Sequence, residues 1–145
     1  MVFSVFFLNF VYESHKIYDG KPELQGLPAV YVEEKEEAQT LEIILRDSLT
    51  GAKMTLYYTI MRDFPVITRS MNLENDGDQS FDLTRAMSAC LDLPDKDYEW
   101  IQLSGAWARE REIKTRKLEQ GIQSVGSLRG NSSHNHNPFI ALKRQ

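Results

Sequence analysis

The chain has 145 residues, of which 41% are hydrophobic and 10% aromatic, enough to fill the core of one domain. It is too short for a (β/α) barrel, which needs about 250 residues. Its 17 basic and 21 acidic side chains give a net charge of −4, which argues against the basic surface that nucleic-acid binding requires. We therefore expect a single domain over residues 1–145 that does not bind nucleic acid.

The chain begins with an apolar stretch, Met1–Phe10, which lacks the basic start of a signal peptide and the small-residue cleavage site that follows one. It also has about half of the roughly 20 residues that a membrane-spanning helix needs. We expect no membrane anchor, and we interpret the stretch as a strand or as the point where a longer chain was cut.

Two later segments alternate apolar and polar residues with a period of two, which is typical of half-buried strands. They are Leu41–Arg46 and Met54–Ile60, and the polar connection Asp47–Gly51 between them predicts an antiparallel hairpin. The acidic run Glu33–Glu37 before them is interpreted as a solvated turn. The side chains expected on one face of their own strand are Leu41, Ile43 and Leu45 in the first segment, and Met54, Leu56, Tyr58 and Ile60 in the second.

The next strand is predicted at Val66–Leu73, which is rich in β-branched residues. Asn75–Asp78 is a strong turn signal because Asn, Asp and Gly tolerate positive φ. Phe81–Leu93 is then expected to form a long strand, with a bulge as an option.

Short apolar-rich runs separated by Gly, Pro, Asn or Asp continue to the end of the chain at Trp100–Ala108, Gly121–Leu128 and Phe139–Leu142. Arg109–Lys117 fits either a charged strand or a helical turn. Together these segments predict a mostly β fold, an antiparallel β-sandwich.

Candidate catalytic or metal-binding groups are few. Asp92, Asp95 and Asp97 form the one tempting carboxyl cluster, but Asp residues in a turn usually accept backbone N–H groups. His134 and His136 could share a face of a strand, yet two ligands do not make a metal site, and no ordered base and acid activate the neighbouring serines. We expect neither a catalytic residue nor a metal or cofactor.

Trp107 and Arg109 are more informative, because two residues two apart on a strand share a face. An exposed Trp can stack on a sugar ring while Arg donates hydrogen bonds to hydroxyls. The alternative is that Trp107 packs in a core or against another domain while Arg109 pairs with an acid. Cys90, the single cysteine, is expected to be a small buried thiol, and a chain without disulfides fits a cytoplasmic location.

Read together, the segments resemble the N-terminal domain of bacterial α-galactosidases of glycoside hydrolase family 36. The most specific stretches are Ile101–Arg111 and the loop that contains Ser132–His134 and Asn137–Phe139. The resemblance spans nearly the whole chain, and its other stretches are Asn9–His15, Gly26–Ala29, Thr55–Thr59, Val66–Arg69, Asp92–Asp95 and Gly121–Gln123.

The resemblance implies a large twisted β-sandwich that precedes a catalytic barrel, and the barrel supplies both catalytic aspartates of a retaining mechanism. No stretch of this chain matches the motifs that carry them, so the chain is expected to be inactive by itself. Met1–Leu8 departs from the family, which implies a sandwich truncated at its N-terminal side.

The resemblance also implies that the sandwich contacts the barrel and takes part in a homo-oligomer. We hypothesise that Trp107, Arg109, His134 and Asn137 lie at a face that meets the barrel or the substrate mouth, because such side chains suit interfaces. The alternative function is an autonomous carbohydrate-binding module with an α-galactoside as its ligand. A free-standing hydrolase would need a carboxylate pair that the sequence does not offer.

Overall fold

The computed structural model of the chain describes residues 8–26, 30–87, 89–129 and 132–144. Their contacts separate two compact units, Met1–Cys90 and Leu91–Gln145. Each unit contains one sheet, and every pair of neighbouring strands runs antiparallel. The mostly antiparallel β fold expected from the sequence is confirmed, whereas a single domain over residues 1–145 stays a prediction.

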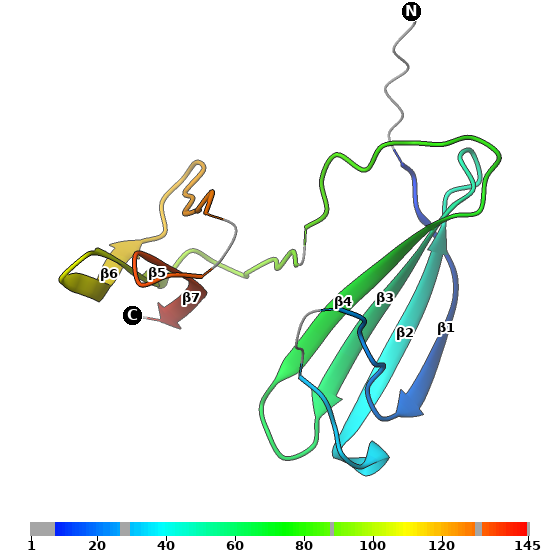
Figure 1. The fold of residues 1–145 in the computed structure, drawn as a ribbon, viewed down its shortest axis with the longest axis horizontal. Helices are drawn as coiled ribbons and strands as arrows, with labels where there is room; N and C mark the ends of the chain where they lie inside the picture. The colour runs from blue at the N-terminus through cyan, green and yellow to red at the C-terminus, as the bar shows by residue number, and fades with distance from the viewer. Residues whose placement is uncertain (1–7, 27–29, 88, 130–131, 145) are drawn as a thin grey trace, which may run out of the picture. The chain divides into compact units, whose positions relative to one another are not determined.

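The first unit is a meander of four strands in the order β1–β2–β3–β4 (Figure 1). A short 3-10 helix, η1, precedes β2 and matches the solvated turn expected at Glu33–Glu37. The bounds are Val11–Asp19 for β1, Lys35–Glu37 for η1, Ala38–Arg46 for β2, Ala52–Met61 for β3 and Ile67–Asn75 for β4.

The predicted hairpin is confirmed as β2 and β3, paired from Ala38 opposite Met61 to Arg46 opposite Lys53. Asp47 holds the turn: its carboxylate accepts the Leu49 N–H at 2.9 Å and the Thr50 hydroxyl at 3.0 Å. These hydrogen bonds, that of Leu49 foremost, lower the pKa of Asp47.

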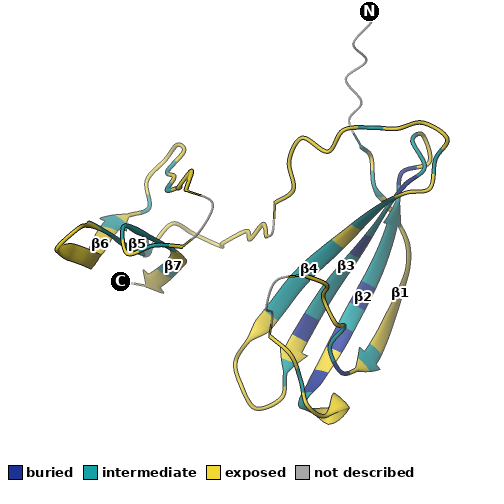
Figure 2. Cartoon of the chain, in the orientation of Figure 1, coloured by how far each residue is buried: buried dark blue, intermediate teal, exposed yellow. Residues whose placement is uncertain are grey.

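The register separates the sheet of the first unit into two faces, because residues directly opposite each other point the same way. One face, here called the apolar face, carries the alternating positions expected from the sequence, and none of its large side chains is buried (Figure 2). Among the described residues, the buried hydrophobic ones are Ala38 and Ala52. The large apolar and aromatic side chains of the apolar face are Tyr12, Ile17, Leu41, Ile43, Leu45, Met54, Leu56, Tyr58, Ile60, Ile67, Met71 and Leu73.

The opposite, polar face contains the more buried side chains of the sheet. Thr40 and Thr59 lie opposite each other, are almost fully buried, and join through their hydroxyls at 2.7 Å. The Thr40 hydroxyl also bonds the Gly20 carbonyl at 2.6 Å. Short polar side chains are thus buried on this face. On the apolar face, the Arg69 guanidinium donates to the Met87 carbonyl at 3.4 Å, and the large side chains stay partly open to solvent.

The second unit is a three-stranded sheet in the order β6–β5–β7 (Figure 1). Its central strand is β5, Tyr98–Ala106, its edges are β6, Arg109–Lys117, and β7, His136–Arg144. Arg109–Lys117 is therefore a charged strand, which settles the two options left by the sequence. The predicted segments at Trp100–Ala108 and Phe139–Leu142 fall on β5 and β7.

Two predicted strands are wrong. Within the described residues, neither Phe81–Leu93 nor Gly121–Leu128 contains a strand. Their apolar side chains do not find a sheet partner and lie exposed, as Leu91 at 81% and Ile122 at 98% show. The strand β1 was not predicted, and the expected strand at Met1–Phe10 lies largely outside the described residues.

In the described part of the chain, no helix has the length and apolar character needed to cross a bilayer.

Candidate functional site

The four residues singled out from the sequence lie at one end of the sheet in the second unit. Trp107 lies in the turn between β5 and β6, and Arg109 is the first residue of β6. His134 lies just before β7, and Asn137 is the second residue of β7. The pairing of Ser104 with His136 brings the start of β7 alongside the end of β5. The structure therefore brings the four residues to the same end of this sheet.

Trp107 does not lie on a strand, which corrects the expectation that it shares a strand face with Arg109. The strand β5 ends at Ala106, which pairs with Arg109, so Trp107 and Ala108 form a two-residue turn. Trp107 is 86% exposed. Of the two readings left open by the sequence, packing in a core of the described chain is therefore excluded, and a surface that meets another molecule or domain remains.

The turn is strained, because Ala108 and Arg111 have φ of 62° and 54°, in the left-handed region that non-glycine residues rarely adopt. The Ala108 N–H donates to the Glu110 carboxylate at 2.9 Å, which fixes this geometry. The N–H groups of Glu110 itself and of Ala108 lower the pKa of the Glu110 carboxyl, and His134 lowers it further. Such strain is often stored where a surface binds something.

Gly105 allows the turn to close. A Cβ at this position would lie 2.1 Å from the Arg109 carbonyl oxygen, so a side chain cannot fit without moving the backbone. The Gly105 N–H instead donates to the Asn135 carbonyl at 2.9 Å. The glycine therefore joins the turn to the loop before β7.

The loop before β7 contributes acceptors that the sequence did not single out. Its backbone is held by the Arg111 N–H, which donates to the His134 carbonyl at 3.3 Å, and by two bonds between Ser133 and His136. Within the described residues, the buried side-chain oxygens of Ser133, Asn135 and Asn137 have no hydrogen-bond partner. Buried oxygens of this kind usually bond to water or to a partner.

Arg109 is exposed and takes part in no ion pair among the described residues. The described residues therefore show no ion pair of the kind that one of the two alternatives assigned to Arg109. Together, Trp107 and Arg109 make an end surface that offers an aromatic ring and a guanidinium, while the three unpaired oxygens are buried near the start of β7.

The carboxyl cluster behaves as the turn that the sequence favoured. The Asp97 N–H donates to the Asp95 carboxylate at 3.0 Å, and Asp95 also pairs with Arg144 of β7. Among the described residues, no three His, Cys, Asp or Glu side chains gather as metal ligands would. Cys90 is exposed rather than buried, because its segment forms no strand.

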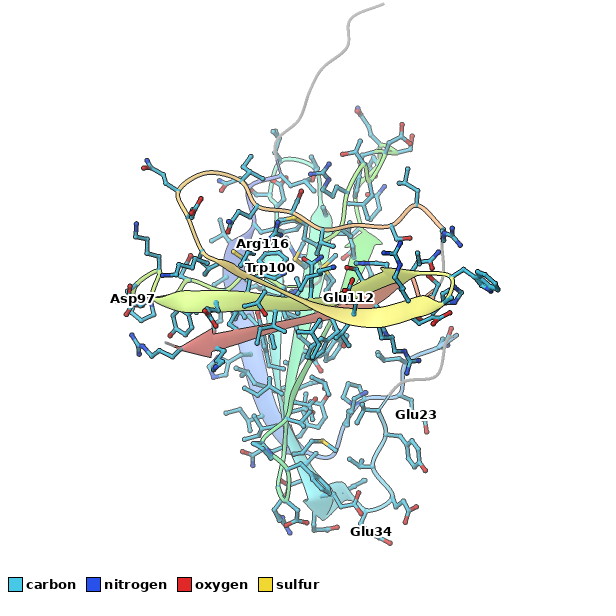
Figure 3. All side chains as sticks on the ribbon, turned by 90° about the vertical axis from the view of Figure 1, so that its left-hand side faces the viewer. Glu23, Glu34, Asp97, Trp100, Glu112 and Arg116 are labelled. Atoms are coloured by element: carbon cyan, nitrogen blue, oxygen red, sulfur yellow. The ribbon has the colours of Figure 1, made fainter. Side chains whose placement is uncertain are left out.

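A second aromatic surface lies on the face of β5. The Arg116 guanidinium stacks over the Trp100 ring at 4.6 Å and donates to the Ser124 carbonyl at 3.3 Å (Figure 3). Because the chain's own arginine covers one side of this ring, Trp100 is a poorer platform for a sugar than Trp107.

Comparison with known proteins places this geometry in a family. The sequence model described as the glycosyl hydrolase family 36 N-terminal domain matches residues 4–145. The alpha-galactosidase AgaA of Geobacillus stearothermophilus is 54% identical over 131 residues, which cover 90% of this chain and 18% of that protein. Alpha-galactosidase 1 of Pediococcus pentosaceus is 47% identical over 93% of this chain and 18% of its own length.

Solved structures agree. The GH36 alpha-galactosidase AgaA of Geobacillus stearothermophilus matches with a TM-score of 0.91 at 52% identity, covering 94% of this chain and 19% of that one. The alpha-galactosidase of Lactobacillus brevis matches with a TM-score of 0.90 at 39% identity, covering 95% and 19%. The chain thus spans less than a fifth of these relatives. The family match over residues 4–145 shows that the chain belongs to the N-terminal domain family of glycoside hydrolase family 36.

Proposed function

We propose that the chain is a non-catalytic structural and assembly domain of an α-galactosidase, and that the end surface around Trp107 contacts the catalytic barrel of that enzyme. The observation that carries the proposal is the turn at the end of the second sheet, which leaves Trp107 86% exposed while Ala108 holds a left-handed backbone. An aromatic anchor surrounded by hydrogen-bonding groups is the usual composition of an interface centre.

Family membership extends the proposal to the whole enzyme. Relatives that match this chain over about a fifth of their length are α-galactosidases. We infer that the parent hydrolyses terminal α-D-galactosyl residues with retention, using two barrel carboxyl groups about 5 Å apart. A homo-oligomer and a cytoplasmic location, expected from the resemblance and the single cysteine, belong to the same proposal.

The first test uses the chain alone. A chromogenic α-galactoside is incubated with the purified chain, and galactose and raffinose are titrated into it by calorimetry. The proposal expects neither turnover nor binding. Turnover would contradict it, while binding without turnover would favour the carbohydrate-binding module, whose one supporting observation is the exposed Trp107 ring.

The second test restores a barrel. The chain replaces the matching segment of the Geobacillus stearothermophilus alpha-galactosidase, with which it is 54% identical. In this chimera, Trp107→Ala should reduce activity or assembly at least tenfold, because a buried aromatic anchor contributes about 2 kcal/mol or more to an interface. Ile122→Ala, which also removes an exposed apolar side chain of the second unit, is the matched control and should have no effect.

A further inference from the structure

The sequence contains two Asp–Gly pairs, Asp19–Gly20 at the end of β1 and Asp76–Gly77 just after β4. An aspartyl residue followed by glycine is chemically labile, because the glycine has no side chain that shields its amide nitrogen from the neighbouring carboxyl group. The nitrogen can bond to the side-chain carboxyl carbon and close a five-membered succinimide ring. Since both pairs have the same residue types, a difference in their reactivity must come from the fold.

The pair at the end of β1 is held by the sheet. Asp19 is the last residue of the strand and lies opposite Gln39 of β2. The Gly20 N–H donates to the Ala38 carbonyl at 2.7 Å, and the Gly20 carbonyl accepts the Thr40 hydroxyl at 2.6 Å. The Gly20 nitrogen therefore cannot turn toward the Asp19 carboxyl group without breaking a buried backbone hydrogen bond.

The pair after β4 is held mainly by side chains. The Gly77 N–H donates to the side-chain oxygen of Asn75 at 3.1 Å, and the Asp76 carboxylate pairs with the Arg46 guanidinium at 3.2 Å. The Asp76 N–H does bond a backbone group, the Gly51 carbonyl at 3.2 Å, but this nitrogen takes no part in ring closure. Exposed side-chain interactions of this kind restrain the reacting groups less firmly than strand pairing does.

We propose that Asp76 is a site of spontaneous isomerisation to isoaspartate, and that the ion pair with Arg46 slows the reaction. The Gly77 nitrogen bonds to the Asp76 side-chain carbon and loses its proton, and one carboxyl oxygen leaves as water. Water then adds to the main-chain carbonyl carbon of the ring, whose bond to the nitrogen breaks, so the chain continues through the side chain. Arg46 opposes ring closure because it favours the ionised carboxylate, from which water does not readily leave.

Isomerisation at this position has a structural consequence for the first unit. Isoaspartate lengthens the main chain by one carbon directly before Gly77. A Cβ on Gly77 would already lie 2.1 Å from the Thr50 carbonyl oxygen, so the backbone has no space to absorb the extra atom here. The reaction therefore separates the loop after β4 from the turn that joins β2 and β3.

The first experiment incubates the purified chain at neutral pH and body temperature. Isoaspartate is counted with an isoaspartyl methyltransferase and located by peptide mass spectrometry, with a urea-unfolded sample as reference. The folded chain should accumulate about fivefold more isoaspartate at Asp76 than at Asp19, the factor expected from one backbone hydrogen bond that must open. Equal amounts at the two positions overturn the proposal. So does a signal that persists in Asp76→Glu, whose six-membered ring closes far more slowly.

The second experiment tests the arginine. Arg46→Ala should raise the rate at Asp76 about threefold, the factor that an exposed ion pair of ordinary strength contributes. The rate at Asp19 should not change, whereas unfolding of the variant would raise both rates, so their ratio separates the two causes. The matched control is Lys16→Ala, which removes the 3.0 Å ion pair with Glu42 in the same sheet and should leave the ratio unchanged. An unchanged ratio in Arg46→Ala overturns the role of the arginine.

Discussion

Both sheets of this chain are antiparallel, but their informative residues lie in different places. In the first unit, the alternation divides the side chains cleanly between an apolar face and a polar face, and its turns serve to keep that register. In the second unit, the informative residues stand at the end of the sheet, where a strained two-residue turn and a loop meet through backbone hydrogen bonds. Regular strand pairing in the first unit thus produces two extended faces, whereas the irregular backbone in the second unit brings the candidate residues together.

The largest change in stability is expected at Gly105 and Gly77, where another part of the backbone passes close to the glycine. A Cβ on Gly105 would meet the Arg109 carbonyl oxygen, and a Cβ on Gly77 would meet the Thr50 carbonyl oxygen, each at 2.1 Å. We expect Gly105→Ala and Gly77→Ala each to destabilise its own unit by about 3 kcal/mol, because backbone must move.

Tryptophan fluorescence distinguishes the two, because both tryptophans, Trp100 and Trp107, belong to the second unit. Urea should lower the fluorescence midpoint of Gly105→Ala, while Gly77→Ala should show its loss in far-UV circular dichroism instead. Equal shifts of the fluorescence midpoint in both variants would mean that the two units unfold together, and would contradict the prediction that each glycine stabilises its own unit.

The buried hydroxyl pair of the first unit gives the next effect. Thr40→Val removes the group that bonds both the Gly20 carbonyl and the Thr59 hydroxyl, so two buried polar atoms lose a partner. We expect a loss of about 2 kcal/mol, against about 1 kcal/mol for Thr59→Val, which leaves the bond to Gly20 in place. Urea unfolding followed by circular dichroism measures both, and a larger loss for Thr59→Val would refute this order.

A gain of stability is expected in the second unit. Ala108 holds a left-handed φ of 62°, which costs an L-residue about 1 kcal/mol relative to glycine. Ala108→Gly should therefore raise the fluorescence-detected Tm, and an unchanged or lower Tm would contradict the prediction. The control is Ala106→Gly, at the last residue of β5, which should lower the Tm.

The smallest expected effect is on the stability of the first unit at acidic pH, through Asp47. The hydrogen bond from the Leu49 N–H holds the pKa of Asp47 below its ordinary 3.8, so the ionised form stabilises the folded state above that pH. The stabilisation is lost as pH falls from about 4 through the lower folded-state pKa. Acid titrations followed by circular dichroism should show a shallower loss for Asp47→Asn than for the unchanged chain, and identical slopes would contradict the assignment.

How far the sequence predicts this molecule depends on whether a signal is local. The hairpin of β2 and β3 was predicted because alternation and turn chemistry both lie within Leu41–Ile60. Phe81–Leu93 was wrong because apolar composition alone does not supply a strand partner. The strand β1 was missed because charged residues interrupt its apolar positions, so that its pairing with β2 decides its structure.

The end surface was predicted in part for the same reason. Trp107, Arg109, His134 and Asn137 are conspicuous residue types, and the structure gathers them at one end of the sheet. The turn at Trp107 and Ala108 contains no glycine or proline, so no residue type in it marks the left-handed backbone of Ala108. The acceptors of Ser133 and Asn135 became candidates only through their burial.

The ion pairs of the first sheet have a consequence for its orientation. Lys16 with Glu42 at 3.0 Å and Lys53 with Glu74 at 2.7 Å link neighbouring strands across the polar face. A layer packed on that side would have to remove water from two pairs of charges, whereas the opposite face is lined mainly by apolar side chains. The ion pairs therefore favour packing of a further layer on the apolar face and keep the polar face toward solvent.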